Sequence, residues 1–211
     1  MKRKQIVLSV VLCLLPIILG VILWNELPEQ IAVHFDNAGN PDNYAPKAFA
    51  VFGLPVFIAV VDAFTLFTTR MDPKAKRHSR QMLRLVYWAC PLLCNIIMPI
   101  TLFMAMGKEI PIGMVVSLMV GLVIVIAGNY LPKCRQNYTI GIKLPWTLND
   151  EENWNYTHRI AGFVWVLAGL AIMVNAFTGS SGVMFAIILF MVAIPFICSF
   201  IFYQKNRAGR A

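Results

Sequence analysis

The sequence has little charge. Asp, Glu, Lys and Arg make up 13% of its 211 residues, and 59% of the residues are hydrophobic. Soluble globular domains have about 25% charged residues, so this composition excludes an ordinary soluble domain and indicates an integral membrane protein. Signatures of catalysis are also missing, because the chain contains no HExxH, GxSxG or P-loop sequence. We therefore predict no enzyme, no catalytic residue and no cofactor.

The placement of the cysteines excludes a disulfide framework. All five cysteines fall within or just beside apolar segments: Cys13, Cys90, Cys94, Cys134 and Cys198. Such positions are not those of a secreted disulfide scaffold. Cys90 and Cys94 share a helix face, which a soft metal could use, but small apolar packing is the favoured interpretation. We predict no metal site.

What the sequence does contain is a set of six apolar blocks. Each block has about 18 to 22 residues, enough for a helix to cross a hydrocarbon core of about 30 Å. The blocks are residues 6–24, 48–69, 85–106, 112–130, 160–177 and 183–203. The first is followed by no small-residue cleavage site, so it is counted as a span. The prediction is an all-α integral membrane protein, a six-transmembrane-helix bundle.

Basic residues are distributed unevenly around these blocks. With six spans and a cytoplasmic N-terminus, only Lys47 and Lys108 of the 18 basic residues lie outside. The inner set is Lys2, Arg3, Lys4, Arg70, Lys74, Lys76, Arg77, Arg80, Arg84, Lys133, Arg135, Lys143, Arg159, Lys205, Arg207 and Arg210. The positive-inside rule therefore predicts a multi-pass cell-membrane protein with both termini cytoplasmic. Anionic membrane lipids explain the net charge of +8, and no direct nucleic-acid binding is expected.

Two connections between the blocks are long. The outer loop covers residues 25–47, and the inner loop covers residues 131–159. We expect a single membrane domain over residues 1–211. It has an N-terminal half over residues 1–106 and a C-terminal half over residues 107–211, with three spans each.

The two loops share a pattern at a constant offset of 104 residues. Asn25 and Pro28 fall on Asn129 and Pro132, and Pro41 falls on Pro145. A true repeat of three spans would make the halves face opposite ways, as in the inverted 3+3 repeats of transporters. The alternative is chance, because prolines are common at helix ends.

The outer loop is rich in residues that form turns. Its central sequence HFDNAGNPD supplies Asn and Asp side chains that bond their own backbone, and a Gly that accepts positive φ. We interpret it as a rigid recognition surface with the candidate residues His34, Asp36, Asn37, Gly39, Pro41 and Asp42. Metal binding by its His and Asp side chains is the weaker alternative, since the ligand spacing of an EF-hand is missing.

Asp62 is the one acidic residue inside a span. A charge near the middle of a membrane costs about 2.5 to 3.5 kcal/mol on insertion scales, so such a residue is functional or paired by default. The structural alternative is a hydrogen bond to Thr65 or to a neighbouring helix, or an ion pair with an Arg near the inner surface.

The second half of the inner loop begins a helix. Asn149 followed by Glu152 matches a capping box, which predicts a helix from Asp150 into the fifth span. On that helix Trp154, Thr157, His158 and Ala161 share one face. This spacing places the indole and imidazole against the membrane surface or a neighbouring helix.

The stretch NYLPKCRQNYTIGIKLPWTLNDEENWNYTHRIAG, residues 129–162, resembles the C-terminal signature of the SdpI family. In that signature an Asn precedes Gly-x-Arg-x-Pro-Trp-Thr-Leu, and a Trp leads into Thr-His-Arg and a Gly. The matching positions are Asn137, Gly141, Pro145, Trp146, Thr147, Leu148, Trp154, Thr157, His158, Arg159 and Gly162. Lys143 stands where the family has Arg, and Lys lacks the planar fork for a bidentate contact. The outer loop resembles the domain of unknown function typical of the family's N-terminus.

The resemblance implies a bacterial immunity protein against a small secreted antimicrobial peptide that collapses the membrane potential of sister cells. It also implies signal transduction, in which the protein holds a cytoplasmic repressor at the membrane. The expected partners are therefore the toxin at the outer loop, the repressor at the inner face, and membrane lipids. The inner motif would serve recognition or coupling. A small transporter or lipid-handling protein that uses Asp62 is the alternative, and an enzyme that uses His158 and Arg159 is disfavoured.

Overall fold

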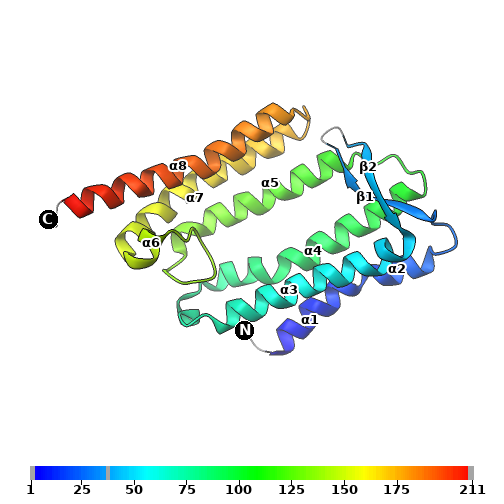
Figure 1. Ribbon diagram of the computed structural model, residues 1–211, viewed down its shortest axis with the longest axis horizontal. Coiled ribbons are helices and arrows are strands. Elements are labelled where there is room, and N and C mark those ends of the chain that lie inside the picture. Colours follow the sequence, from blue (N-terminus) through cyan, green and yellow to red (C-terminus); the bar gives the residue numbers. More distant parts are fainter. Residues whose placement is uncertain (1–2, 37–38, 209–211) are drawn as a thin grey trace. The chain divides into compact units, whose positions relative to one another are not determined.

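The computed structural model describes residues 3–36 and 39–208. Six of its helical stretches are long and apolar enough to cross a membrane (Figure 1). They are Arg3–Ile22, Phe49–Met71, Arg80–Ala105, Ile112–Lys133, Glu151–Asn175 and Ser181–Arg207. Each overlaps one of the six apolar blocks, so the predicted six-span helical architecture is confirmed.

Most elements are helices, and one hairpin interrupts them. In chain order they are α1 (Arg3–Leu14), α2 (Pro16–Ile22), β1 (Gln30–Phe35), β2 (Pro41–Pro46), η1 (Phe49–Gly53), α3 (Leu54–Met71), η2 (Ala75–Arg77), α4 (Arg80–Ala105), α5 (Ile112–Tyr130), η3 (Leu131–Lys133), α6 (Pro145–Asn149), α7 (Glu151–Asn175) and α8 (Ser181–Ala208). The first span consists of two helices because Pro16 has no N–H to donate to Leu12.

The chain forms two compact units. The first comprises Met1–Phe67 and Val86–Val116, and the second comprises Thr68–Leu85 and Ser117–Ala211. Each unit has its own buried residues and its own candidate site. The two are therefore described separately.

In the first unit, the outer loop folds as an antiparallel β-hairpin where the sequence suggested only turns. Ile31 pairs with Ala45, and both are buried. Ile31 packs with Leu27, Val51 and Leu102 in the unit's apolar core. The strand-forming sequence QIAVHF explains β1, and the burial of its Ile side chain fixes which face of the hairpin turns inward.

Lys47 anchors the base of this hairpin. Its Nζ donates to the carbonyl oxygens of Trp24 at 3.4 Å and Leu27 at 3.3 Å, and to Glu29 Oε1 at 2.9 Å. The ammonium also lies 4.9 Å from the centre of the Trp24 ring, a distance at which a cation is attracted to the aromatic face. The buried ammonium group of Lys47 therefore holds the hairpin to the end of the first span through these contacts.

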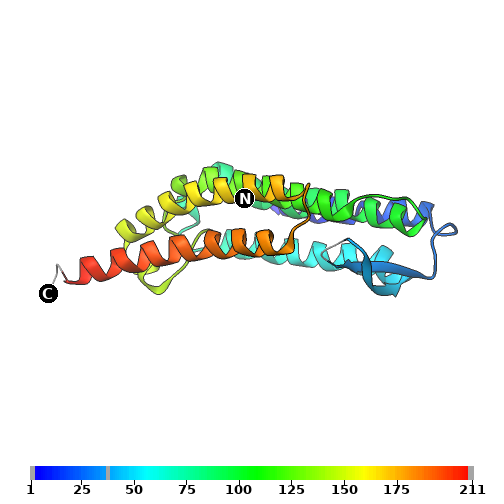
Figure 2. The same cartoon turned by 90° about the horizontal axis from the view of Figure 1, so that it is seen from above.

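In the second unit, α7 and α8 pack side by side as an antiparallel pair (Figure 2). Helix α7 also lies close to α5, because a glycine of one helix faces a glycine of the other at two positions along their length. A Cβ on Gly128 would lie 2.9 Å from the Gly162 carbonyl oxygen, and one on Gly121 would lie 2.7 Å from the Gly169 carbonyl oxygen. Small residues let helix backbones approach in this way within membranes.

Candidate functional site

The tip of the β1–β2 hairpin gathers the predicted outer residues. Asp36 Oδ1 accepts the Asn40 backbone N–H at 2.8 Å, and its Oδ2 accepts the Asn40 side-chain amide at 3.2 Å. Gly39 supplies a left-handed conformation with φ of +87°, and Pro41 begins β2. Asn37 lies outside the described residues. The predicted Asp side-chain bonds to nearby groups and the positive φ of Gly39 are therefore both present in the described part of the turn.

His34 and Asp42 face each other across the hairpin. Their Nδ1 and Oδ1 atoms are 2.6 Å apart, and the two side chains are 68% and 44% exposed. Tyr44 is exposed on the same hairpin. An exposed pair of this kind adds little stability to the fold. Because both side chains are exposed, another molecule can contact them. Among the described residues, no group of three or more His, Cys, Asp or Glu side chains is arranged to hold a metal.

Most of the inner-loop motif is buried rather than displayed. Asn137 is fully buried, and its amide donates to the carbonyls of Arg135 at 2.8 Å and Ile140 at 2.9 Å. Its Oδ1 accepts the backbone N–H groups of Thr139 and Ile140. Asn137 therefore shapes the loop by satisfying backbone groups that no helix or strand satisfies.

Cys134 lies beside Asn137 and is buried as well. Burial raises the pKa of its thiol to about 11, so it is a thiol at neutral pH. The thiol lies 3.4 Å from the Ile140 carbonyl oxygen, to which it donates. A protonated, buried thiol is unreactive, which makes Cys134 a structural residue.

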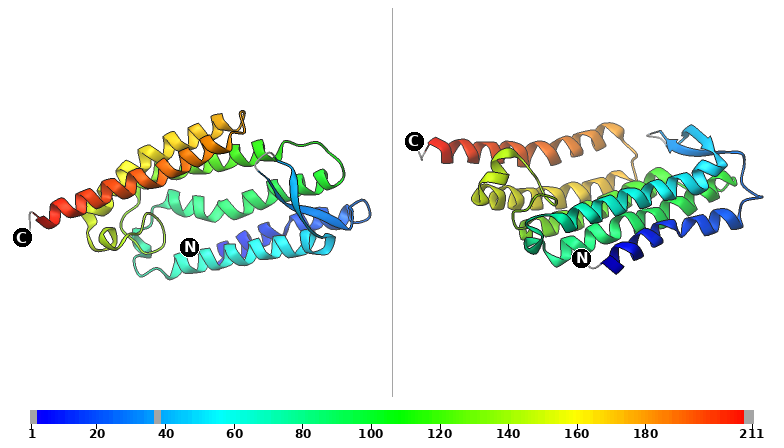
Figure 3. Two further views of the ribbon diagram at one scale, coloured as in Figure 1. Left: turned by 45° about the horizontal axis from the view of Figure 1, so that its top comes forward. Right: turned by 60° about the horizontal axis from the view of Figure 1, so that its bottom comes forward.

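The inner loop lies beside the start of α7 (Figure 3), and Gly141, Trp154 and His158 pack together where the two meet. The Trp154 and His158 rings are stacked with centroids 4.1 Å apart, and the indole N–H donates to the Cys134 carbonyl at 2.7 Å. Gly141 has φ of +121°, and a Cβ there would overlap His158 Nε2 and the Trp154 ring. Only glycine fits this position.

Asp72 ties the connection between α3 and α4 to the same loop. Its carboxylate accepts the N–H groups of Lys74 at 2.7 Å and Tyr138 at 2.9 Å, and the Thr139 hydroxyl at 2.8 Å. Burial opposes its ionisation, but these bonds together with His78 hold the pKa of Asp72 below its usual range. A buried carboxylate thus stays charged because hydrogen bonds replace its hydration.

Lys74 and Gln136 extend this contact. Lys74 Nζ donates to Gln136 Oε1 at 2.7 Å and lies 4.7 Å from the centre of the Tyr138 ring. The Gln136 amide donates in turn to the carbonyls of Thr147 and Leu148 at the end of α6. These bonds link three separate segments of the second unit.

A second polar cluster lies between α7 and α8. The Thr157 hydroxyl lies 2.7 Å from Ser199 Oγ and 2.9 Å from Asn153 Oδ1, and Ser199 Oγ is 2.7 Å from the same Asn153 oxygen. The indole N–H of Trp146 donates to Ser199 Oγ at 2.9 Å. Asn153, Thr157 and Ser199 are fully buried. The cluster therefore fixes α6 and α7 to α8.

The remaining motif residues have different environments. Thr147 is buried and accepts the Leu144 N–H at 2.9 Å, which caps α6. Lys143 and Pro145 are exposed, and Lys143 Nζ donates to the Thr139 carbonyl at 3.1 Å. Arg159 is exposed, whereas its neighbour His158 is fully buried. His158 and Arg159 therefore lie in different environments and do not form a joint site.

The predicted start of the fifth helix is corrected by one residue. Asp150, not Asn149, is the N-cap, because Asp150 Oδ1 accepts the N–H groups of Glu152 and Asn153. The Asn149 amide instead donates to the Pro145 carbonyl at 2.8 Å. Asn149 closes α6 as its last residue, so it cannot also begin α7.

Asp62 is buried in the first unit, inside α3. Neither of its carboxylate oxygens has a hydrogen-bond partner among the described residues. Ser9 and Cys90 lie next to it, but the Ser9 hydroxyl donates to the Tyr87 carbonyl at 3.1 Å. Thr65 donates to the Val61 carbonyl at 2.8 Å, and the Thr65 bond to Asp62 that was one structural alternative is not formed.

Several residues of the site escaped the sequence analysis. They are Asp72, His78, Gln136, Asn153 and Ser199. Gln136 and Asn153 lie inside the quoted motif. Their polar side chains were the signal that could have marked them as residues of the site. Ser199 is a lone polar residue in the last span, which is the signal for a buried interhelical bond.

Comparison with known proteins agrees with the predicted resemblance. Residues 133–201 match the family model described as "SdpI/YfhL protein family", and residues 11–59 match "Domain of unknown function (DUF1648)". The chain is 29% identical over 210 residues to "Immunity protein SdpI" of Bacillus subtilis (strain 168), which covers 98% of this chain and 100% of the relative. No solved structure matches. The resemblance is therefore confirmed: residues 133–201 are similar to the SdpI/YfhL family, and residues 11–59, which precede them, are similar to the DUF1648 domain.

Proposed function

We propose that this protein is a membrane immunity protein that protects a bacterium against a secreted antimicrobial peptide. The observation that carries the proposal is similarity to an immunity protein along nearly the full length of both chains. Six membrane-spanning helices agree with this role, because a toxin that acts on the membrane is met most directly by a protein within it. No residue is assigned a catalytic task.

The toxin would first meet the tip of the β1–β2 hairpin. His34, Asp36 and Asp42 place polar groups on its exposed surface, and Tyr44 adds an aromatic ring. Lys47 and the packing of Ile31 hold the hairpin rigid, so little ordering is needed on binding. The positive-inside rule supports an orientation with this hairpin outside the cell and both termini inside.

The inner loop would serve recognition or coupling on the cytoplasmic side. Its buried motif residues act as a scaffold, whereas Lys143, Arg159 and the Arg77–Glu151 pair are exposed. A cytoplasmic repressor would contact this exposed basic surface. The signalling role rests on the immunity proposal and needs such a repressor to be encoded beside the gene.

Growth under toxin tests the immunity proposal. A toxin-sensitive bacterium that expresses this chain should grow at concentrations of the peptide that stop cells with an empty vector. The peptides to use are the one that the SdpI family confers immunity to and any short hydrophobic secreted peptide encoded beside the gene. Equal inhibition of both strains, with the protein abundant in the membrane, would contradict the proposal.

A second candidate function is transport, for which Asp62 is the specific observation. A fully buried carboxyl group with neither oxygen bonded within the described residues is expensive in a membrane and functional by default. Asp62→Asn keeps the size of the side chain and removes its ability to exchange a proton. The variant should stop substrate or proton movement in vesicles while remaining folded. Unchanged movement would remove the main reason for this candidate.

A further inference from the structure

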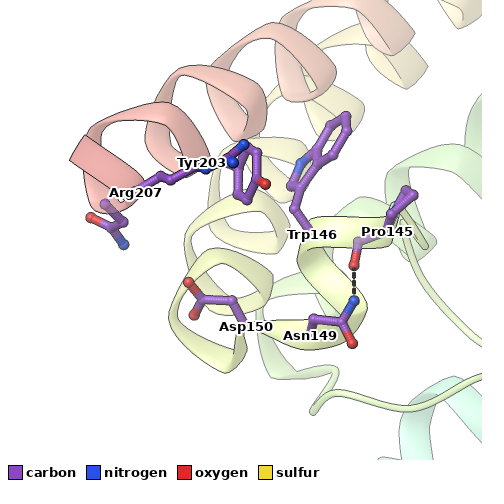
Figure 4. Close-up of a pocket in the computed structure, with 7 residues that line it drawn as sticks. Pro145, Trp146, Asn149, Asp150, Tyr203 and Arg207 are labelled. Atoms are coloured by element: carbon purple, nitrogen blue, oxygen red, sulfur yellow. Dashed lines mark hydrogen bonds between the residues drawn. The ribbon is translucent and has the colours of Figure 1, made fainter. Parts of the chain in front are cut away.

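A pocket of about 680 Å³ lies in the second unit, where α6, the start of α7 and the end of α8 meet (Figure 4). It is lined by Pro145, Trp146, Asn149, Asp150, Tyr203, Asn206 and Arg207. Its volume is within the range of about 300 to 1,000 Å³ that suits small ligands. Aromatic rings, amides, one carboxylate and one guanidinium therefore converge on a single space.

The charges of this lining balance. Asp150 contributes the carboxylate and Arg207 the guanidinium. The two hydrogen bonds of the Asp150 cap both end on Oδ1, which leaves Oδ2 available to a ligand. A ligand with separate positive and negative groups matches such a pocket better than a simple anion, which would face the Asp150 carboxylate.

Each end of a zwitterion finds a suitable partner here. A guanidinium binds phosphate with two parallel hydrogen bonds. A carboxylate beside aromatic rings suits an ammonium group, which is attracted to both. The Trp146 and Tyr203 rings are stacked with centroids 5.7 Å apart, and Figure 4 shows them together beside α8.

The pocket adjoins the apolar surface of a membrane-spanning helix, because Trp146 in its lining contacts Phe196 and Phe200 of α8. Phe196, Phe200, Tyr203 and Arg207 follow one another at helical spacing along one face of α8. Phe196 and Phe200 are 45% and 40% exposed, and each forms a T-shaped ring contact with Trp146. An acyl chain can lie along these rings while its headgroup fills the pocket, and Trp and Tyr are typical of this depth in a membrane.

We propose that this pocket binds the ammonium-and-phosphate headgroup of a zwitterionic phospholipid, with the phosphate on Arg207 and the ammonium between Asp150 and the aromatic rings. The nature of the ligand follows from the lining alone and does not depend on the immunity role. A soluble phosphoethanolamine carries the same headgroup chemistry, so the experiment compares both sources.

Thermal unfolding of the purified full-length protein in detergent tests this site. Short-chain phosphatidylethanolamine should raise the melting temperature at lower concentration than phosphatidylglycerol does. Asp150→Asn should require about tenfold more phosphatidylethanolamine for half the effect, while Asn preserves the helix cap. Arg207→Gln should weaken stabilisation by both lipids. The matched controls Glu152→Gln and Lys205→Gln remove the same charges outside the pocket and should behave as the unmodified chain.

Three results separate the outcomes. Equal stabilisation by both lipids, or an unchanged response in Asp150→Asn and Arg207→Gln, would overturn the proposal. Stabilisation by soluble phosphoethanolamine as strong as by the lipid would support the headgroup chemistry and assign it to a soluble source. An effect of Lys205→Gln as large as that of Arg207→Gln would also overturn it, because general attraction to basic residues would then explain the binding.

Discussion

His158 accepts the backbone N–H of Ile142 on Nε2 at 3.0 Å, across sixteen residues of chain. Its other nitrogen, Nδ1, lies 2.8 Å from the Trp154 carbonyl oxygen. A carbonyl can only accept, so Nδ1 carries the proton and Nε2 does not. The imidazole is therefore neutral, and it joins the inner loop to α7 instead of presenting a charge to a partner.

Removing this imidazole should destabilise the second unit. In His158→Ala the Ile142 N–H loses its acceptor, and a cavity opens beside the Trp154 ring. The two effects should lower the free energy of unfolding by about 2 to 4 kcal/mol. Arg159→Ala is the matched control, because Arg159 is exposed and its loss should change stability by less than about 0.5 kcal/mol. Thermal unfolding in detergent measures both, and equal melting temperatures would contradict the assigned role.

Gly141→Ala separates backbone strain from steric overlap. The new methyl group would meet His158 and Trp154, and the positive φ adds strain. Gly179 also has positive φ, at +62°, but a Cβ there meets nothing within 4 Å. Gly179→Ala should therefore cost about 1 to 2 kcal/mol, and Gly141→Ala should cost more. An equal loss of stability in the two variants would show that the loop moves away from α7 without cost.

Asp72 should make the stability of the protein sensitive to acid. Its pKa is lower in the folded protein than in the unfolded chain, where Asp titrates near pH 4. The stabilisation is thus fully present above about pH 4 and is lost as the pH falls through the folded pKa. Asp72→Asn should be less stable at pH 7, and its melting temperature should fall less below pH 4. Glu151→Gln alters an exposed carboxylate and should keep the acid dependence of the unmodified chain.

We expect Ser199 to contribute to the stability of the second unit, because three side chains form hydrogen bonds with its hydroxyl. In Ser199→Ala, Trp146, Asn153 and Thr157 each lose a bond, and Asn153 and Thr157 are fully buried. We expect a loss of about 1 to 3 kcal/mol in the free energy of unfolding. Ser180→Ala, in the turn before α8, is the control and should cost less. A double-mutant cycle with Thr157→Val should show coupling between the two positions, and additive losses would contradict a shared network.

Composition and the length of the apolar blocks were enough to predict the six spans, because hydrocarbon thickness fixes their length. They were not enough for the hairpin. The turn residues from Asp36 to Asp42 were identified, but the strands on either side are short, and packing of Ile31 against Leu102 stabilises them. Local sequence does not show contacts between residues so far apart.

The candidate site was predicted only as a motif. Its sequence marked Asn137, Gly141 and His158, but not what they do, because their roles depend on a folded loop. Ser199 and Asp72 contribute from other segments, 46 residues after Asn153 and 66 before Tyr138. Only the folded structure brings these partners together, and it assigns most of the motif to scaffolding.

Membrane potential measured during exposure to toxin tests the central claim most directly. Toxin-sensitive bacteria that express this chain are loaded with a potential-sensitive dye and treated with the antimicrobial peptide. The account predicts that the potential persists at peptide concentrations that collapse it in cells with an empty vector. Gly141→Ala at equal abundance should protect less. Collapse at the same concentration in both strains, with the unmodified protein abundant in the membrane, would contradict an immunity function.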